Sequence, residues 1–438
     1  MADKGMTLAI VLLVAGLIVG GGIGYFAAPT KTETVSTTVI QTVTQIPLKG
    51  VTVKLGYIAS DTTGLETGKP YHEKIIAADL NLYSKTLGYG TTFLYLVDDA
   101  TGQANVHLEK VQGFKSAGVT VFEGGGWSSQ AQSALSYCNS NGMLMWSSSS
   151  TSPTLAIAND NLFRMCTADT ALAPALANVM WAAGVKSIVL FQRGDSWGDG
   201  IINLLVPIWT KMGGEVAGEK IRYASESVEF ANYLTVADQQ VKTAVEKYKG
   251  ETQRVGVVIL SFNEISVILK QVSSYPNIYN VHWWGSDGTA KSQRAMDDAP
   301  VEANHIGIYS LLSRETLTPL YQSLEKRYVD LTKQQYGTYS AYSYDIATVI
   351  ATSMFQAQST TGATLIPLQM PISNQLFGAA GWSKLDQFGD RAAPPYDVWG
   401  FFKGATKASV SVIMAQYDPD FQKTTFVTSV LGYTPIGP

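Results

Sequence analysis

The chain has 438 residues, of which 46% are hydrophobic and 15% are charged, and its formal net charge is -4. This length exceeds what a single hydrophobic core usually serves, so two domains of ordinary size are expected. The small net charge and the lack of any Lys/Arg block in the body exclude nucleic acid as a partner, because binding phosphates requires a basic surface.

The N-terminal segment is the strongest local feature of the sequence. Residues 6–28 contain no charged side chain, and about 20 apolar residues at a rise of 1.5 Å each span a bilayer core. Lys4 precedes this run, so the positive-inside tendency places everything after it outside the cytoplasm. We therefore expect residues 1–28 to form a transmembrane helix that anchors the protein in the cell membrane.

Residues 1–28 also allow another interpretation. Lys4-Gly5 directly before the apolar run resembles a class III, pilin-like signal, which is cut after the glycine. No cysteine ends the run, which excludes a lipoprotein anchor, and the proline after Ala28 makes a poor site for cleavage of a secretory signal. Glycines recur at four-residue spacing in the run, which allows close helix packing but is also ordinary in a lipid-exposed helix.

Residues 29–49 are expected to form a stalk between membrane and body. They are rich in Thr and Val and show no convincing core pattern, which is typical of an extended linker, although a short strand is an alternative. The folded, ligand-binding part is predicted at residues 50–438. Its two cysteines, Cys138 and Cys166, permit a disulfide in an oxidising compartment but do not require one.

From residue 51 onward the sequence alternates between predicted strands and helices. Strands are expected at 51–59 and 91–97, followed by helices at about 70–87 and 106–116 respectively. A later unit has an apolar strand at 188–191, then apolar residues at helical spacing. This alternation favours an α/β fold with parallel sheets covered by helices.

The economical architecture is two doubly wound parallel-sheet lobes joined by a hinge that the chain crosses several times. The first lobe is expected to comprise about 50–168 and 305–375. The second is expected to comprise about 169–304 and 376–438.

Ligands of open parallel sheets bind beyond the carboxyl ends of the strands, so the residues at those ends are the candidate site. In the first lobe, GGGWSSQ follows one strand and places Ser128 at a helix N-terminus, where free N–H groups favour a carboxylate. SSSSTSP follows the next strand, and its Ser149 and Thr151 offer further hydroxyls. Serine-rich turns are often only solvated loops. The hypothesis of a ligand site therefore depends on the fact that all of these groups follow predicted strands.

The second lobe presents a different set of side chains at the same edge. Asp287, in GSDG, is placed to receive an ammonium or amide N–H, although it also suits a simple turn. Trp197, in RGDSWGDG, lies at the same edge and forms either a cleft wall or lobe packing, and Phe262 follows another strand. Opposite charges on opposite lobes would suit a zwitterion.

The ordered motifs resemble a known family. VKLGYIA, VDDATGQANV, GGGWSSQAQSAL, GMLMWSSSSTSP, NLFRMCTADT, DSWGDG, GGEV, GSDG, YSYDIA and WSKLDQFGDR follow the order seen in type I periplasmic binding proteins of the Leu/Ile/Val-binding and amide/urea-binding group. The resemblance covers roughly residues 51–402. It implies that the protein is the solute-binding component of an ABC importer, captures a small amino-acid-like or amide ligand by hinge closure and engages an ABC permease.

The resemblance also implies roles for individual residues. Ser128, Ser149 and Thr151 would hold the ligand carboxylate or carbonyl, and Asp287 would receive the amino group. Trp197 stands where the family usually has tyrosine, and Phe262 is expected to face the cleft. The extra aromatic surface, including Trp127, leaves the ligand side chain open, and the region 360–381 looks expanded.

Other classes of function have less support in the sequence. No motif of a metalloprotease, serine hydrolase or P-loop enzyme occurs, so we expect no catalytic residue, no metal and no cofactor. A ligand sensor that acts through a signalling partner is conceivable. Self-assembly into a surface filament or array is a third possibility, which a cleft blocked by Trp127 and Trp197 would favour.

Overall fold

The computed structural model of the chain describes residues 47–392, 394–403, 409–431 and 435–437. The predicted membrane segment and nearly all of the predicted stalk therefore lie outside the described residues. Within the part of the chain that is described, no helix is both long enough and apolar enough to cross a bilayer.

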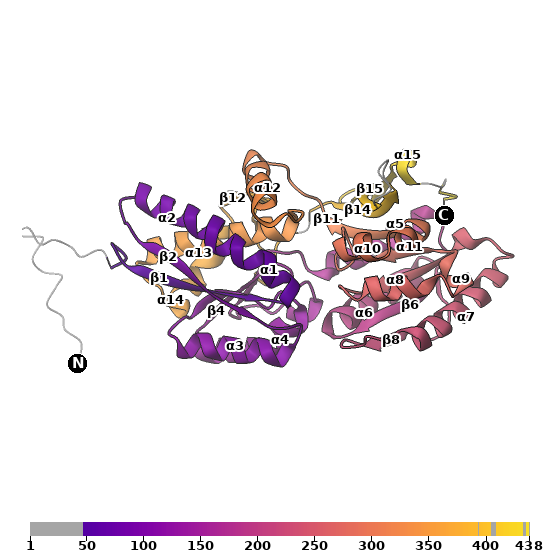
Figure 1. Ribbon diagram of the computed structural model, residues 1–438, viewed down its shortest axis with the longest axis horizontal. Coiled ribbons are helices and arrows are strands. Elements are labelled where there is room, and N and C mark those ends of the chain that lie inside the picture. The colour runs from indigo at the N-terminus through magenta and orange to yellow at the C-terminus, as the bar shows by residue number, and fades with distance from the viewer. Residues whose placement is uncertain (1–46, 393, 404–408, 432–434, 438) are drawn as a thin grey trace, which may run out of the picture. The chain divides into compact units, whose positions relative to one another are not determined.

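The first lobe is built on a five-stranded parallel sheet with the order β2-β1-β3-β4-β5 (Figure 1). Its strands are β1 (Thr52–Ala59), β2 (Thr92–Asp99), β3 (Val121–Glu123), β4 (Leu144–Ser147) and β5 (Leu162–Arg164). Its first helices are α1 (Thr62–Tyr71), the π-helical turn η1 (His72–Ile76), α2 (Ala77–Thr86), α3 (Ala104–Ser116) and α4 (Ser128–Asn141). Helices α3 and α4 pack on one face of the sheet, and η1 and α2 pack on the other.

Later segments return to complete the first lobe. They are α12 (Pro319–Thr332), α13 (Thr338–Ala357), α14 (Gly362–Ser373) and the short pair β12 (Phe377–Gly378) and β13 (Gly381–Trp382). Apolar residues of these helices share the hydrophobic core of β1 and η1. The region 360–381, which looks expanded in the sequence, thus forms α14 and the β12–β13 hairpin.

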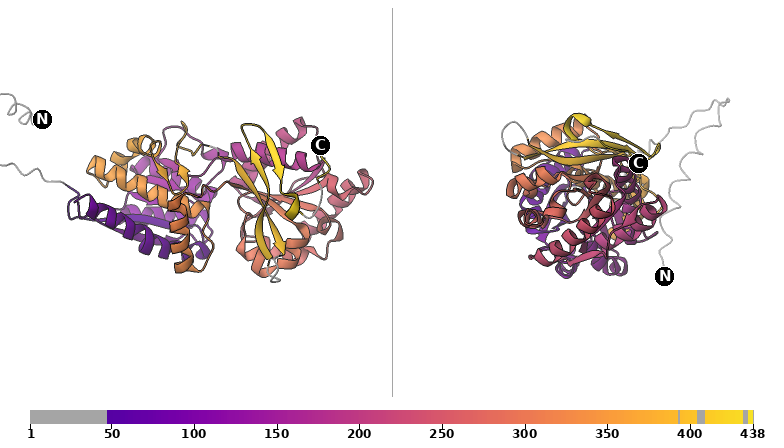
Figure 2. Two further views of the ribbon diagram at one scale, coloured as in Figure 1. Left: turned by 90° about the horizontal axis from the view of Figure 1, so that it is seen from above. Right: turned by 90° about the vertical axis from the view of Figure 1, so that its right-hand side faces the viewer.

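The second lobe has a nine-stranded sheet, with the order β16-β15-β14-β11-β10-β9-β6-β7 and with β8 also paired to β6. Its strands are β6 (Ser187–Gly194), β7 (Glu215–Val216), β8 (Ile221–Ala224), β9 (Val255–Leu260), β10 (His282–Gly285), β11 (Ile308–Ser313), β14 (Tyr396–Lys403), β15 (Ser409–Asp418) and β16 (Lys423–Phe426). Strands β6 to β11 are parallel, whereas β14, β15 and β16 add antiparallel strands, drawn in yellow in Figure 2. The predicted α/β fold with parallel sheets is confirmed, with this antiparallel edge as an addition.

Helices cover both faces of the second sheet. The helices are α5 (Asp169–Ala183), α6 (Ser196–Lys211), α7 (Ala231–Lys247), α8 (Ile265–Val272), α9 (Pro276–Tyr279), α10 (Gln293–Asp298), α11 (Pro300–Ile306) and α15 (Thr428–Leu431), with short 3-10 turns η2 (Pro153–Leu155) and η3 (Thr252–Arg254) in the connections of the two lobes. Residues of α5 and α6 share one core, and residues of α7, α8 and α11 share another. The sheet is therefore sandwiched, as expected for a mainly parallel sheet.

The described chain passes between the two lobes three times. It crosses from β5 to α5, from β11 to α12, and from the residues after β13 to β14. Strand β11 pairs with β10, so it belongs to the second lobe and not to the first, which was expected to resume at residue 305. Ala379, Ala380 and Leu385 pack in the core of the first lobe, so its last part extends beyond residue 375.

One helix begins earlier than expected, and the two cysteines, whose pairing the sequence left open, are free. The helix expected at about 70–87 begins at Thr62, because Asp61 caps it and accepts a hydrogen bond from the Gly64 N–H at 2.8 Å. Pro70 lies inside this helix, and Tyr71 separates it from the π-helical turn that begins at His72. Cys138 and Cys166 are free thiols buried in different hydrophobic clusters, and burial raises the pKa of Cys138 to about 12.

Candidate functional site

A cavity of about 610 Å³ is lined by residues from both lobes. Part of its wall comes from segments that directly follow strands, and the rest comes mainly from α1, from the region of α10 and from residues 334–340. The residues that follow strands are Ser60 and Asp61 after β1, Gly124, Gly126, Trp127 and Ser128 after β3, Ser148 and Ser149 after β4, Trp197 after β6, Phe262 and Asn263 after β9, and Asp287 and Gly288 after β10. The volume lies within the usual range for small-molecule sites. The cavity thus occupies the edge at which the sequence predicted a ligand site.

On the first lobe, Ser128 and Ser149 line the cavity. Ser128 begins α4, and its Oγ accepts a hydrogen bond from the Ser152 N–H at 3.1 Å. The Ser149 Oγ donates to the carbonyl of Gly126 at 2.8 Å. A Cβ at Gly126 would lie 2.3 Å from the Ser60 Oγ and 3.1 Å from the Ser149 Oγ, so a larger residue here would displace these hydroxyls.

Thr151 does not line this cavity, in contrast to the other five residues predicted for the site. Its side chain is buried, and its Oγ1 has no hydrogen-bond partner among the described residues. The physical reason lies in the loop, because the carbonyls of Ser150 and Ser152 both accept hydrogen bonds from Nη1 of Arg164. The two flanking peptides are therefore fixed toward the interior.

On the second lobe, Trp197 and Phe262 form part of an aromatic stack. The ring centroids of Trp197 and Phe262 are 4.4 Å apart, and Phe262 stacks in turn on Trp127 of the first lobe at 4.9 Å. The Arg193 guanidinium lies 5.0 Å from the ring centroids of both Trp127 and Phe262. Trp197 is thus both a cavity wall and a packed residue, which unites the two roles that the sequence left open.

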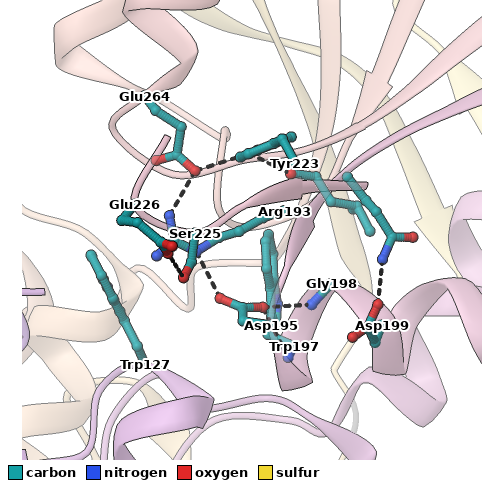
Figure 3. Close-up of polar contacts among 12 residues, drawn as sticks. Trp127, Arg193, Asp195, Trp197, Gly198, Asp199, Tyr223, Ser225, Glu226 and Glu264 are labelled. Carbon is teal, nitrogen blue, oxygen red and sulfur yellow. Dashed lines mark hydrogen bonds and ion pairs between the residues drawn. The ribbon is translucent and has the colours of Figure 1, made fainter. Parts of the chain in front are cut away.

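Two carboxylates hold the guanidinium of Arg193, which lies beside this stack (Figure 3). Arg193 Nε donates to Asp195 at 2.7 Å, and its Nη1 donates to Glu264 at 2.8 Å. Asp195 also caps α6 by accepting hydrogen bonds from the N–H groups of Trp197 and Gly198. The position of Trp197 therefore follows from the capping of its own helix.

Asp287 lies at the boundary between the lobes. Its Oδ2 accepts a hydrogen bond from the hydroxyl of Tyr339, which belongs to α13 of the first lobe. Its Oδ1 is buried and has no hydrogen-bond partner among the described residues. Burial raises the pKa of Asp287, and the bond from Tyr339 opposes this shift.

The charge of Asp287 acts on a second carboxyl group, that of Asp169. Asp169 is the first residue of α5 and is fully buried, with both oxygens unpartnered in the described part of the chain. Burial raises the pKa of Asp169 well above its usual range, and the charge of Asp287 raises it further. The interior behind the cavity therefore disfavours two negative charges at once.

Asp61, Glu123 and Tyr339 are among the residues of the cavity lining that the sequence reasoning missed. Glu123 is buried, and it accepts a hydrogen bond from Ser343 while lying 3.1 Å from Nε2 of His72. One signal for it was present, since a carboxylate closes an otherwise apolar strand directly before the GGG motif. Tyr339 gave no such signal, because it comes from a distant helix.

Two mainly parallel α/β lobes, three crossings between them and a ligand-sized cavity at the strand ends define a type I periplasmic-binding-protein fold. The model of the family described as "Receptor family ligand binding region" matches residues 77–403. The chain belongs to this family.

This chain is similar to one curated protein in sequence and to a solved structure in fold. An uncharacterized protein of Methanocaldococcus jannaschii is 25% identical over 408 residues, which cover 88% of this chain and 93% of that protein. The structure of a leucine binding protein from Thermotoga maritima has a TM-score of 0.67 at 16% identity, covering 84% of this chain and 99% of that one.

Two further solved structures are described with their ligands. A branched-chain amino acid transporter substrate binding protein of Streptococcus pneumoniae, in complex with isoleucine, has a TM-score of 0.63 at 15% identity and covers 83% of this chain and 99% of its own. An ABC transporter solute binding protein of R. palustris, in complex with benzoate, has a TM-score of 0.63 at 16% identity. The match covers 83% of this chain and 96% of that one. Proteins of this fold thus bind chemically different small carboxylates.

Proposed function

We propose that the protein is the solute-binding component of an ABC importer and captures a small amino-acid-like or amide ligand by hinge closure. The observation that carries the proposal is the cavity of about 610 Å³ bounded by both lobes. Hydroxyl groups of Ser128 and Ser149 line it from the first lobe, and the carboxyl group of Asp287 lines it from the second. A zwitterion would therefore meet complementary groups on opposite walls.

Hinge closure is supported by polar contacts that join the lobes directly. Nδ2 of Asn263, after β9, donates to Asp61, after β1, at 2.8 Å. Nη2 of Arg294, on α10, donates to Thr63, on α1, at 2.8 Å. A ligand held by both lobes adds to these contacts and so favours the closed arrangement, which is the state a permease can recognise.

The cavity also bears on the alternative of a surface array. Trp127 and Trp197 stack with Phe262 along its wall, and a ligand-sized volume remains beside them. The cleft is therefore not filled by these rings, which favours solute binding. We also infer that the body lies outside the cytoplasm and that residues 1–28 anchor it in the membrane, because residues 6–28 carry no charge and are numerous enough for a helix that spans a bilayer.

The proposal is tested by calorimetric titration of the purified full-length protein with amino acids, short amides and urea. We expect saturable binding in the micromolar range for at least one of them, which corresponds to about -8 kcal/mol. Ser149→Ala should weaken that binding about tenfold, because it removes a hydroxyl from the carboxylate side of the cavity. Ser323→Ala, on the exposed surface of α12, is the matched control and should bind as wild type does.

An absence of heat with every compound in the panel would refute the amino-acid or amide assignment. Equal losses in Ser149→Ala and Ser323→Ala would refute the location of the site.

A further inference from the structure

The charged residues of the cavity lining are mostly acidic. Five carboxyl side chains and two basic side chains contribute to it. The acidic residues are Asp61, Glu66, Glu123, Asp287 and Asp297, and the basic residues are Lys291 and Arg294. Complementarity of charge between a site and its ligand is a main source of specificity.

The two basic residues already have partners. Lys291 Nζ donates to Glu315 at 2.9 Å and lies 4.5 Å from the ring centroid of Trp399. Arg294 is exposed and donates to the hydroxyl of Thr63. Neither cation therefore balances a carboxylate of the lining.

Among the described residues, only one of these acidic groups has a basic partner, because Glu123 lies 3.1 Å from Nε2 of His72. Within the described ranges, none of the five forms an ion pair with Lys or Arg. Arg193, the remaining cation beside the aromatic stack, is bound to Asp195 and Glu264. The lining of the cavity thus carries more acidic than basic side chains.

The most enclosed acidic groups lie on both lobes. Glu123 is 4% exposed, and Asp287 has a buried Oδ1 without a hydrogen-bond partner in the described part of the chain. Asp61 is partly buried at the start of α1. Burying an unpaired acceptor costs free energy, so a ligand that donates to Asp287 removes this cost.

Trp127, Phe262 and Trp197 form an aromatic wall that could contact the apolar part of a ligand. These stacked rings line the same cavity as the three carboxylates. Aromatic surface suits an aliphatic stem, and it also attracts a cation that approaches a ring. Together, the rings and carboxylates match a cationic head on a short apolar chain.

We propose that the ligand carries a positively charged ammonium or guanidinium group on a short aliphatic stem, received by the carboxylates of Asp61, Glu123 and Asp287. This inference rests on the proposed solute-binding function and narrows its ligand class. The same chemistry occurs in basic amino acids and in the amines formed by their decarboxylation. The carboxylate of an amino acid would meet Ser128 and Ser149, whereas a simple amine would leave them unused.

The experiment compares cationic compounds with neutral analogues of similar shape, using calorimetry on the full-length protein. The amino-acid pairs are arginine with citrulline and lysine with norleucine, and the amines are agmatine and cadaverine. We expect each basic amino acid to bind at least about tenfold more tightly than its neutral analogue, because charge-assisted hydrogen bonds are the stronger kind. Added salt should weaken arginine binding more than citrulline binding.

Variants locate the effect. Asp287→Asn and Asp61→Asn keep the side-chain shape, and each should reduce the arginine-to-citrulline ratio several-fold. Asp420→Asn changes an exposed aspartate in the second lobe and should leave the ratio unchanged. Circular dichroism of each variant establishes that it folds, and the two separate sites keep the test valid if one variant does not.

The outcomes separate this inference from the function on which it rests. Tight binding of citrulline, norleucine or leucine, with no gain for the cationic analogue, would overturn the inference and leave the solute-binding function standing. Equal binding of arginine and agmatine would support the cationic class and refute the amino-acid assignment. Failure of every compound would overturn both.

Discussion

Asp160 is a buried carboxyl group whose ionisation affects stability. One oxygen accepts a hydrogen bond from the Leu162 N–H at 3.0 Å, and the other has no partner among the described residues. Burial raises its pKa from 3.8 to about 6. The native state therefore binds this proton more readily than the unfolded chain. The group stabilises the fold below pH 4, and that contribution is lost as the pH rises through about 6.

Asp160→Asn should remove this pH dependence. Relative to wild type, the variant should gain about 1–2 kcal/mol of unfolding free energy between pH 4.5 and pH 7.5, because it never carries the buried charge. Urea unfolding at the two pH values measures the difference. A difference between the proteins that stays constant over this range would contradict the raised pKa of Asp160.

Arg164, at the end of β5, connects segments that are far apart in the chain. Its guanidinium forms a bidentate ion pair with Asp390, and its Nη1 holds the carbonyls of Ser150 and Ser152. The backbones of Arg164 and Asp390 also form an isolated parallel β-bridge. The fully buried side chain of Arg164 thus fixes the serine-rich loop, the first crossing between the lobes and the approach to the third crossing.

Arg164→Met should lower the unfolding free energy by about 3–5 kcal/mol, because it leaves Asp390 as an unpaired buried charge. The double variant Arg164→Met with Asp390→Leu should recover much of this loss, since both charges are then removed. Chemical denaturation of the two single variants and the double variant forms the cycle that measures the coupling. Additive effects in that cycle would show that the pair does not act as a unit.

Strands and most helices could be predicted from the sequence because their apolar periodicity is local. The expected strand at 51–59 is β1, and the expected helix at 106–116 lies within α3. The early start of α1 at Thr62 depends on one capping carboxylate and on a π-helical turn that absorbs the irregularity after Pro70. The antiparallel edge β14–β16 depends on tertiary pairing with β11, which periodicity does not encode.

At the scale of the whole molecule, the position of the site followed from the rule that ligands bind at strand carboxyl ends. Five of the six residues named from the sequence line one cavity, and the exception, Thr151, is turned inward by Arg164. Contacts between the lobes could not be predicted from the sequence, because residues such as Tyr339 and Asp287 lie far apart in the chain and meet only through the hinge crossings. Roles for individual residues within the cavity remain predictions.

The stack of Trp127 on Phe262 joins the two lobes through side chains alone, so it should bias the hinge in solution. An aromatic pair contributes about 0.5–1.5 kcal/mol beyond its buried area, which corresponds to up to about a tenfold change in the ratio of closed to open molecules. Trp127→Ala should therefore increase the radius of gyration of the ligand-free protein in small-angle X-ray scattering. It should also weaken ligand binding by up to about tenfold.

Phe421→Ala separates this effect from the loss of an aromatic ring in general, because Phe421 is 79% exposed in the turn between β15 and β16. It should change neither the radius of gyration nor the affinity. If Trp127→Ala weakened binding while the scattering stayed that of wild type, Trp127 would act as a wall of the cavity and not on the hinge. If it changed the scattering and saturating ligand restored the compact form, the ring would act on the same equilibrium as the ligand, as linkage between closure and binding requires.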